Sequence, residues 1–147
     1  MKGYKPDGST DLLEKFTNSM MWQGKKNTAR DIMSKTLEEL RRLGHADPVT
    51  AFETALKNVM PQIEVRPKRV GGAVYQIPME VNSKRQTSLS IRWVLSAARK
   101  KKGSNMFKKL ATELHDAINE QGEAFKKKQD VKKMAEANKA FAHFANY

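Results

Sequence analysis

Apolar residues recur every three or four positions through the first part of the chain, which is the spacing of an amphipathic helix. Three such segments occur before residue 62, and each has a polar residue suited to a helix start. We expect Asp11, Asn27 and Asp47 at these starts, with Pro48 at the first helical position of the third. The predicted ranges, closed by glycine or proline, are 11–24, 27–44 and 47–61.

Between residues 63 and 81 the apolar period changes from 3.6 to 2. Ile63 and Val65 share one side of an outgoing strand, and alternate residues from Tyr75 onward share one side of a returning strand. Gly71 and Gly72 can supply the positive φ angles of a two-residue hairpin turn. Prolines in both strands cannot donate hydrogen bonds, so the strands need free edges. We therefore predict a two-stranded ribbon, which is marginal alone unless something packs on it or binds it.

Helical periodicity returns after the ribbon. Ser83 and Gln86 have the spacing of a capping box, and a wide apolar face then predicts a fourth helix ending in the sequence ARKKKG. Further apolar stripes predict a fifth helix that stops at Gly122 and a sixth that runs from about Glu123 to the C-terminus.

These elements predict a mainly α fold with a single domain over residues 11–147. It contains six helices, and the two-stranded β-ribbon of residues 63–81 protrudes between helices three and four. The opening sequence MKGYKPDGST has no periodicity, so residues 1–10 are expected to form a flexible N-terminal arm. A chain of 147 residues is long enough to bury a sizeable core.

Charge indicates the class of partner. Lysine and arginine number 28 against 16 acidic residues, which gives a formal net charge of +12 and favours a polyanion. The chain has no cysteine, which excludes disulfides, thiolate zinc sites and a cysteine nucleophile. No apolar run approaches the roughly 20 residues that a membrane span needs. We therefore expect a nucleic-acid partner and no membrane.

Enzyme motifs are incomplete. The sequence GKKNT resembles part of a phosphate loop, but the earlier glycine of that motif is replaced by Ser19. The Gly71-Gly72 pair lacks the spacing of a dinucleotide loop, and no H-E-x-x-H pattern occurs. Adjacent carboxylates such as Glu38 and Glu39 suit a solvated helix face. We predict no catalytic residue, no cofactor, no metal site and no small-molecule substrate.

The basic residues are better organised than the acidic ones. Arg85, Arg92 and Arg99 are seven positions apart and so share one side of the fourth predicted helix. Such a stripe suits phosphate contact, although an ordinary solvated face is the alternative. Further cationic clusters lie at residues 25–26, 66–69, 99–102 and 126–128. Simpler explanations exist here too, because cations stabilise helix C-termini and protect the edges of strands.

Four segments resemble the bacterial and organellar small-subunit ribosomal protein seven family: RVGGAVYQIPMEV, SIRWVLSAARKKKG, NMFKKLATELHDA and MAEANKAFAHF. The resemblance covers about Asp11 to Phe144. It implies a structural, non-enzymatic constituent of the small ribosomal subunit that binds ribosomal RNA first and nucleates assembly of the head, the three-prime domain. It also implies a ribbon near the exit site, messenger RNA and transfer RNA, with ribosomal proteins as neighbours.

The resemblance implies RNA contact for a subset of the basic residues and places Trp93, Met134 and Phe141 in or near the core. Together with the residues chosen by spacing and charge, the candidate RNA-binding set is Lys25, Lys26, Arg66, Lys68, Arg69, Gly71, Gly72, Tyr75, Gln76, Arg85, Arg92, Arg99, Lys100, Lys101 and Lys102.

Two further expectations concern compartment and class. The sequence KFTNSMM looks more like mitochondrial members of the family, so a mitochondrial ribosome is favoured over a bacterial or plastid one. The competing function is an architectural DNA-binding protein whose basic β-arm enters the minor groove. Such proteins usually dimerise through their helices, whereas six amphipathic helices can close a core within one chain.

Overall fold

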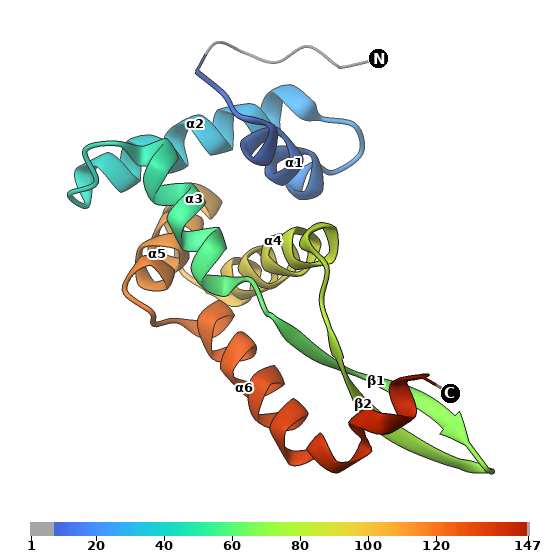
Figure 1. The fold of residues 1–147 in the computed structure, drawn as a ribbon. Helices are drawn as coiled ribbons and strands as arrows, with labels where there is room; N and C mark the ends of the chain where they lie inside the picture. Colours follow the sequence, from blue (N-terminus) through green and yellow to red (C-terminus); the bar gives the residue numbers. More distant parts are fainter. Residues whose placement is uncertain (1–7, 147) are drawn as a thin grey trace.

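The computed structural model describes residues 8–146, so most of the expected N-terminal arm lies outside the described residues. It confirms a mainly α fold with one antiparallel ribbon between the third and fourth helices (Figure 1). The elements in order are α1 Asp11–Met20, α2 Lys26–Arg42, α3 Pro48–Val59, β1 Ile63–Val70, β2 Ala73–Glu80, α4 Ser83–Lys100, α5 Met106–Ile118, α6 Glu123–Ala137 and the 3-10 helix η1 Lys139–Asn146. The short η1 is an element that periodicity did not predict.

The helices pack their apolar faces into one core. Phe16 of α1 and Phe52 of α3 are fully buried and meet edge to face, with ring centroids 5.1 Å apart. Leu40 of α2, Val94 of α4 and Leu114 of α5 are also fully buried in the same cluster. Burying each side chain of this kind stabilises the fold by about 1.5–3 kcal/mol. This core holds the body from which the ribbon extends.

The observed helix start agrees with expectation at α3, differs by one residue at α1 and α4, and differs by two residues at α2. Asp47 caps α3 as predicted, with its carboxylate accepting a hydrogen bond from the Thr50 backbone. Thr10 caps α1 where we expected Asp11. The N-cap position of α2 is Lys25, two residues before the expected Asn27, and it makes no side-chain cap.

The capping box predicted at Ser83 and Gln86 is wrong. Asn82 has extended backbone angles, and its side-chain oxygen accepts a hydrogen bond of 2.9 Å from the Arg85 backbone N–H. Ser83 is therefore already the first helical residue. Either residue type can cap a helix, and the path of the chain leaving the ribbon selects the earlier one.

The ribbon has the predicted two-residue turn, since Gly71 and Gly72 have φ angles of 58° and 87°. Its register pairs Lys68 with Tyr75 and Arg69 with Val74. Directly opposed residues share a face, so the apolar side of β1 and the apolar side of β2 lie on opposite faces of the ribbon. Each face of the ribbon is thus partly apolar and partly charged.

The C-terminal segment covers one of these faces. The helix α6 ends at Ala137, because the side chain of Asn138 turns back to the Met134 carbonyl at 2.8 Å and η1 follows. Phe141 and Phe144 of η1 lie 5.0 and 5.1 Å from the ring centroid of Tyr75. A sixth helix continuing to the C-terminus was therefore the wrong prediction, and Met134, half exposed, is not a core residue.

Candidate nucleic-acid interface

The predicted arginine stripe on α4 divides into two parts. Arg92 and Arg99 are exposed and line a hollow between α1 and α4, together with Lys100 and the serine side chains of both helices. Arg85 is only partly exposed, and its Nε lies 3.4 Å from a carboxylate oxygen of Glu64. Two of the three arginines are thus available to a ligand, and the third joins α4 to the ribbon.

Glu64 at the base of the ribbon also pairs with Arg66, a second residue predicted to contact RNA. Its buried carboxylate accepts a hydrogen bond of 2.9 Å from Nε of Arg66. Arg66 and Arg85 therefore meet on one acidic group, which fixes the ribbon against the start of α4. The Glu64–Arg66 pair is readable from sequence, because residues two apart on a strand share a face. The contact with Arg85, across 21 positions of the chain, is not.

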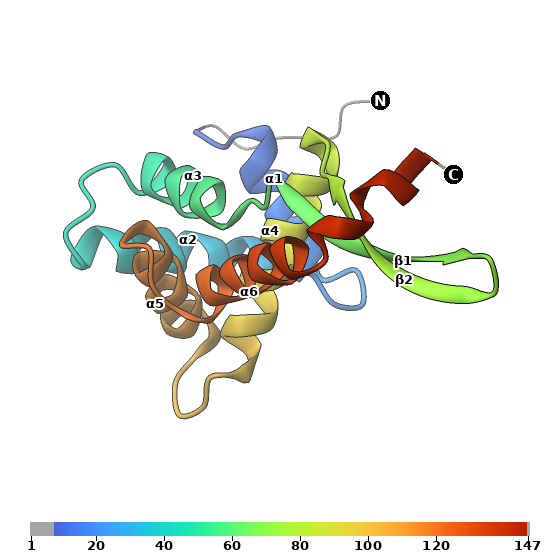
Figure 2. The ribbon, with the colours of Figure 1, turned by 60° about the horizontal axis from the view of Figure 1, so that its bottom comes forward.

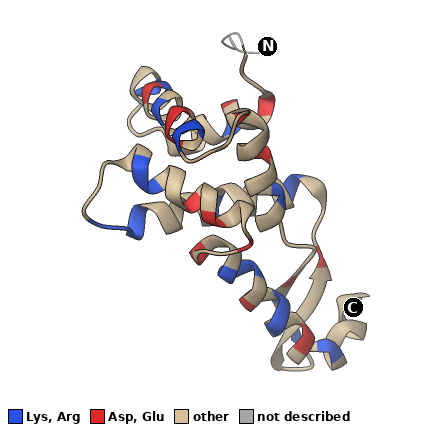
Figure 3. Ribbon diagram, turned by 90° about the vertical axis from the view of Figure 1, so that its left-hand side faces the viewer, with Lys and Arg blue, Asp and Glu red and all other residues tan. Residues whose placement is uncertain are grey.

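The loop between α4 and α5 (Figure 2) has basic residues on both sides, at the end of α4 and in the first turn of α5 (Figure 3). Lys100 and Lys102 are exposed as the candidate set requires. Lys101 instead points inward, with its Nζ 3.4 Å from the fully buried carboxylate of Glu113. Lys101 is therefore a structural residue, which could not be told apart by sequence from its neighbours in the run of cations at residues 99–102.

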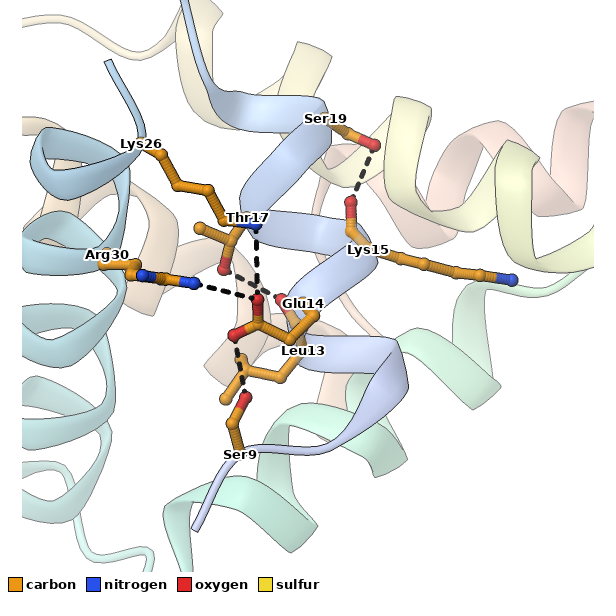
Figure 4. A network of polar contacts seen from close by, with 8 residues as sticks. All are labelled: Ser9, Leu13, Glu14, Lys15, Thr17, Ser19, Lys26 and Arg30. Carbon is orange, nitrogen blue, oxygen red and sulfur yellow. Dashed lines mark hydrogen bonds and ion pairs between the residues drawn. The ribbon is translucent and has the colours of Figure 1, made fainter. Parts of the chain in front are cut away.

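The cluster at residues 25–26 divides in the same way. Lys25 is exposed, whereas the ammonium group of Lys26 lies 3.5 Å from Glu14 of α1. Arg30 approaches the same carboxylate at 3.6 Å, and Ser9 donates a hydrogen bond to it (Figure 4). Lys26 therefore joins α1 to α2, and Lys25 is the member of the pair that faces outward.

The ribbon presents one open face near its tip. Arg69 and Gln76 are exposed on this face, beside Val74, which is 61% exposed. On the other face Lys68 donates a hydrogen bond of 3.4 Å to the Ala145 carbonyl, and Tyr75 is covered by the rings of η1. Lys68 and Tyr75, both predicted to contact RNA, thus contact the chain's own C-terminal segment.

Gly71 and Gly72 at the tip are exposed, and no atom lies within 4 Å of the Cβ that a larger residue would carry. Their positive φ angles are what favours glycine at these two positions. The tip is therefore open enough for backbone to approach a ligand.

Three neighbouring hollows connect the exposed cations into one region. Lys25 and Arg99 line the first, Arg99 and Lys100 the second, and Lys100 and Lys127 the third. The third, between α4 and α6, also contains Trp93 and two carboxylates. We use the name basic surface for the exposed cations of this region, which are Lys25, Arg92, Arg99, Lys100, Lys126 and Lys127.

Sequence reasoning missed Trp22. Its side chain is 70% exposed at the end of α1 and lies under Arg99, whose guanidinium carbon is 5.9 Å from the ring centroid. The available signal was a tryptophan placed directly after an apolar helical stripe and before two lysines. An exposed aromatic ring of this size beside cations is a feature of nucleic-acid surfaces.

The perturbed titratable groups lie elsewhere, around the connection between α2 and α3. Nε2 of His45 lies 2.8 Å from Nδ1 of His115, and burial together with the His115 charge lowers the pKa of His45 below 6.5. A hydrogen bond from Thr50 lowers the pKa of Asp47, and one from Arg42 lowers the pKa of Glu39. None of these groups lines the three hollows.

Two further features concern residues 8–146 as a whole. Within this range no group of three or more histidine, cysteine or acidic side chains is placed to hold a metal ion. None of the helices described is both long enough and apolar enough to cross a membrane.

Comparison with known proteins relates the chain to one family. The family model described as ribosomal protein S7p/S5e matches residues 3–139. The small ribosomal subunit protein uS7 of Solibacter usitatus is 52% identical over 92% of this chain and 87% of its own length. The corresponding protein of Thermosipho africanus is 53% identical over 90% and 86%, and that of Nautilia profundicola is 49% identical over 95% and 90%. These relatives are bacterial, so they give no support to the mitochondrial assignment.

Proposed function

Because the chain belongs to the ribosomal protein S7p/S5e family, we propose that it is a structural, non-enzymatic component of the small ribosomal subunit that binds ribosomal RNA. In this role it is a primary binder that nucleates assembly of the head, gripping the three-prime domain of the RNA. Other small-subunit proteins are its neighbours in the particle.

One observation carries the RNA-binding part of this proposal: the basic surface is continuous and spans several elements. Arg99 and Lys100 of α4 are each shared by two adjacent hollows, which links cations of the α1–α2 turn, α4 and α6. The predicted contacts that turn inward, Lys26, Arg85 and Lys101, hold these helices in place. A rigid body with outward cations suits a folded polyanion better than a flexible tail would.

Phosphate contact is the proposed source of affinity. If about 6–10 phosphates are neutralised, affinity falls by about 10³–10⁵-fold between 50 and 200 mM salt. Specificity then comes from the shape of an RNA junction, because base edges of duplex RNA are poorly accessible to side chains. We assign the contacts to the basic surface and to Lys102, and we assign structural roles to Arg66 and Arg85.

The ribbon is proposed to serve a different part of the subunit. Its open face, with Arg69 and Gln76 beside the Gly71-Gly72 tip, would lie near the exit site, messenger RNA and transfer RNA. The face covered by η1 is excluded from that contact, since the C-terminal segment already occupies it.

The test is a double charge reversal, Arg92→Glu with Arg99→Glu. We expect loss of binding to three-prime-domain RNA, with the thermal transition little changed because both side chains are exposed. The matched control is Lys57→Glu with Lys84→Glu, which changes the net charge equally at exposed positions outside the basic surface. Equal binding by the two double variants would contradict the assignment. Equal affinity of the unmodified chain for duplex DNA of the same length would favour the architectural DNA-binding alternative.

A further inference from the structure

The turn between α1 and α2 holds Trp22 away from the core. The helix α1 ends at Met20, and Met21 adopts extended backbone angles. Gln23 and Gly24 then take positive φ angles of 54° and 71°, and the Lys25 N–H closes the turn on the Trp22 carbonyl at 3.0 Å. A positive φ at a residue other than glycine is uncommon and marks a constrained turn. The exposed ring is therefore placed by the backbone of the turn.

Beneath the ring lies an apolar hollow of about 380 Å³. This volume is within the range of roughly 300–1,000 Å³ that small-molecule sites occupy. Its floor and walls include Met20, Ile32 and Met106, whose flexible or branched side chains fit a flat ring. Lys25 and Arg99 line the same hollow, and no acidic residue does.

The chemistry of this site is that of a nucleotide. An apolar slot with an aromatic wall fits a planar base, and cations at its rim fit the phosphates on either side of that base. Arg99, already over the Trp22 ring at 5.9 Å, is placed to keep the indole oriented. An apolar protein segment would also fill the slot, but it would gain little from the two cations.

We propose that Trp22 is a base-stacking residue, and that the slot takes one unpaired nucleobase of ribosomal RNA whose neighbouring phosphates contact Lys25 and Arg99. The inference rests on the proposed RNA-binding function and adds to it a contact with a base. A single-stranded bulge, loop or end supplies such a base, whereas a paired helix does not. Trp22 thus distinguishes unpaired from paired RNA at one point of the basic surface.

Affinity measurements on the full chain test the stacking contact. Stacking is worth about 1–3 kcal/mol per base, so Trp22→Ala is expected to weaken binding to a single-stranded oligoribonucleotide by about 5- to 150-fold. Trp22→Phe should retain most of the affinity, because a ring remains. The dependence on salt should stay unchanged, since Trp22 carries no charge. Met134→Ala is the control, as it shortens another exposed apolar side chain outside the slot.

Fluorescence provides the second measurement. The chain has 2 tryptophans, so Trp93→Phe leaves Trp22 as the single emitter. We expect single-stranded RNA to quench this emission and fully paired RNA to leave it unchanged at the same bound fraction. Unaltered affinity in Trp22→Ala, or equal quenching by both RNAs, would overturn the inference. Failure of the unmodified chain to bind any RNA at low salt would instead overturn the proposed function itself.

Discussion

Glu113 of α5 accepts a hydrogen bond of 2.8 Å from the backbone N–H of Ala124 at the start of α6. Both residues are buried, and Gly122, which precedes the helix, has no side chain to serve as a cap. The carboxylate therefore caps α6 from a neighbouring helix and also lies 3.4 Å from Lys101. One side chain thereby joins the end of α4, the middle of α5 and the start of α6.

Replacing this carboxylate should destabilise the fold in a graded way. Glu113→Ala leaves the Ala124 N–H without an acceptor, which costs about 1–3 kcal/mol before any cavity is counted. Glu113→Gln keeps an acceptor oxygen and loses the charge, so we expect a smaller decrease in the free energy of unfolding. Urea denaturation of the two variants provides the measurement. Equal losses would show that the charge, not the hydrogen bond, is what matters.

Gly122 should tolerate alanine less well than Gly103. Both have positive φ, at 91° and 87°, so each substitution carries the backbone cost of that conformation. At Gly122 the added Cβ would also lie 3.0 Å from the Asp116 Cβ and from a carboxylate oxygen of Glu113, whereas at Gly103 nothing lies within 4 Å. We expect each to lose on the order of 1–3 kcal/mol, with Gly122→Ala the larger. The difference in melting temperature between the two variants measures the steric cost of the added Cβ at Gly122. A larger loss of stability for Gly103→Ala would contradict this expectation.

The stability of the fold should decline with acid because of His45. The pKa of His45 is lowered in the folded chain, so the unfolded chain binds its proton more readily. Its contribution to stability is therefore complete above pH 6.5, falls as the pH drops through the folded pKa, and is constant below that. Melting temperatures between pH 8 and pH 5 should decline less for His45→Gln than for the unmodified chain. Asp47 does not confuse the comparison, since its pKa is lowered from 3.8 and it titrates at more acid pH.

The C-terminal segment should loosen when Tyr75 is removed. Tyr75→Ala deletes the ring that Phe141 and Phe144 contact, and each aromatic pair contributes about 0.5–1.5 kcal/mol beyond its buried area. We expect faster amide exchange and faster proteolysis in residues 139–146, with little change in the melting of the helical body. Val74→Ala is the matched control, because it lies next to Tyr75 on the opposite, open face. Loosening of η1 by both variants would mean that the ring contacts are not its anchor.

Local patterns were sufficient for the helices and the ribbon. A period of 3.6 or 2 depends on neighbours within a few positions, so α1 to α5 and the Gly71-Gly72 turn could be predicted from sequence. Caps were less certain, because Thr10 and Asp11, or Asn82 and Ser83, are adjacent residues with similar capping ability. The choice between them depends on how the chain enters the helix.

Contacts distant in sequence could not be predicted. The position of η1 involves Tyr75 of the ribbon, which no local pattern connects to Phe141. Charge counts likewise identified the basic clusters but not which members turn inward, because Glu64, Glu113 and Glu14 each reach cations on other elements. Trp22 escaped notice because a periodic pattern treats an exposed aromatic residue as one more apolar position.

The face of the ribbon that η1 covers limits the side from which a ligand can contact the ribbon. Since η1 lies against Tyr75 on one face, the face of the ribbon that stays open to a ligand is the one with Arg69, Val74 and Gln76. If the ribbon contacts RNA as proposed, η1 lies behind the ribbon and the RNA in front. The position of the C-terminus in such a complex then reports which way the ribbon faces.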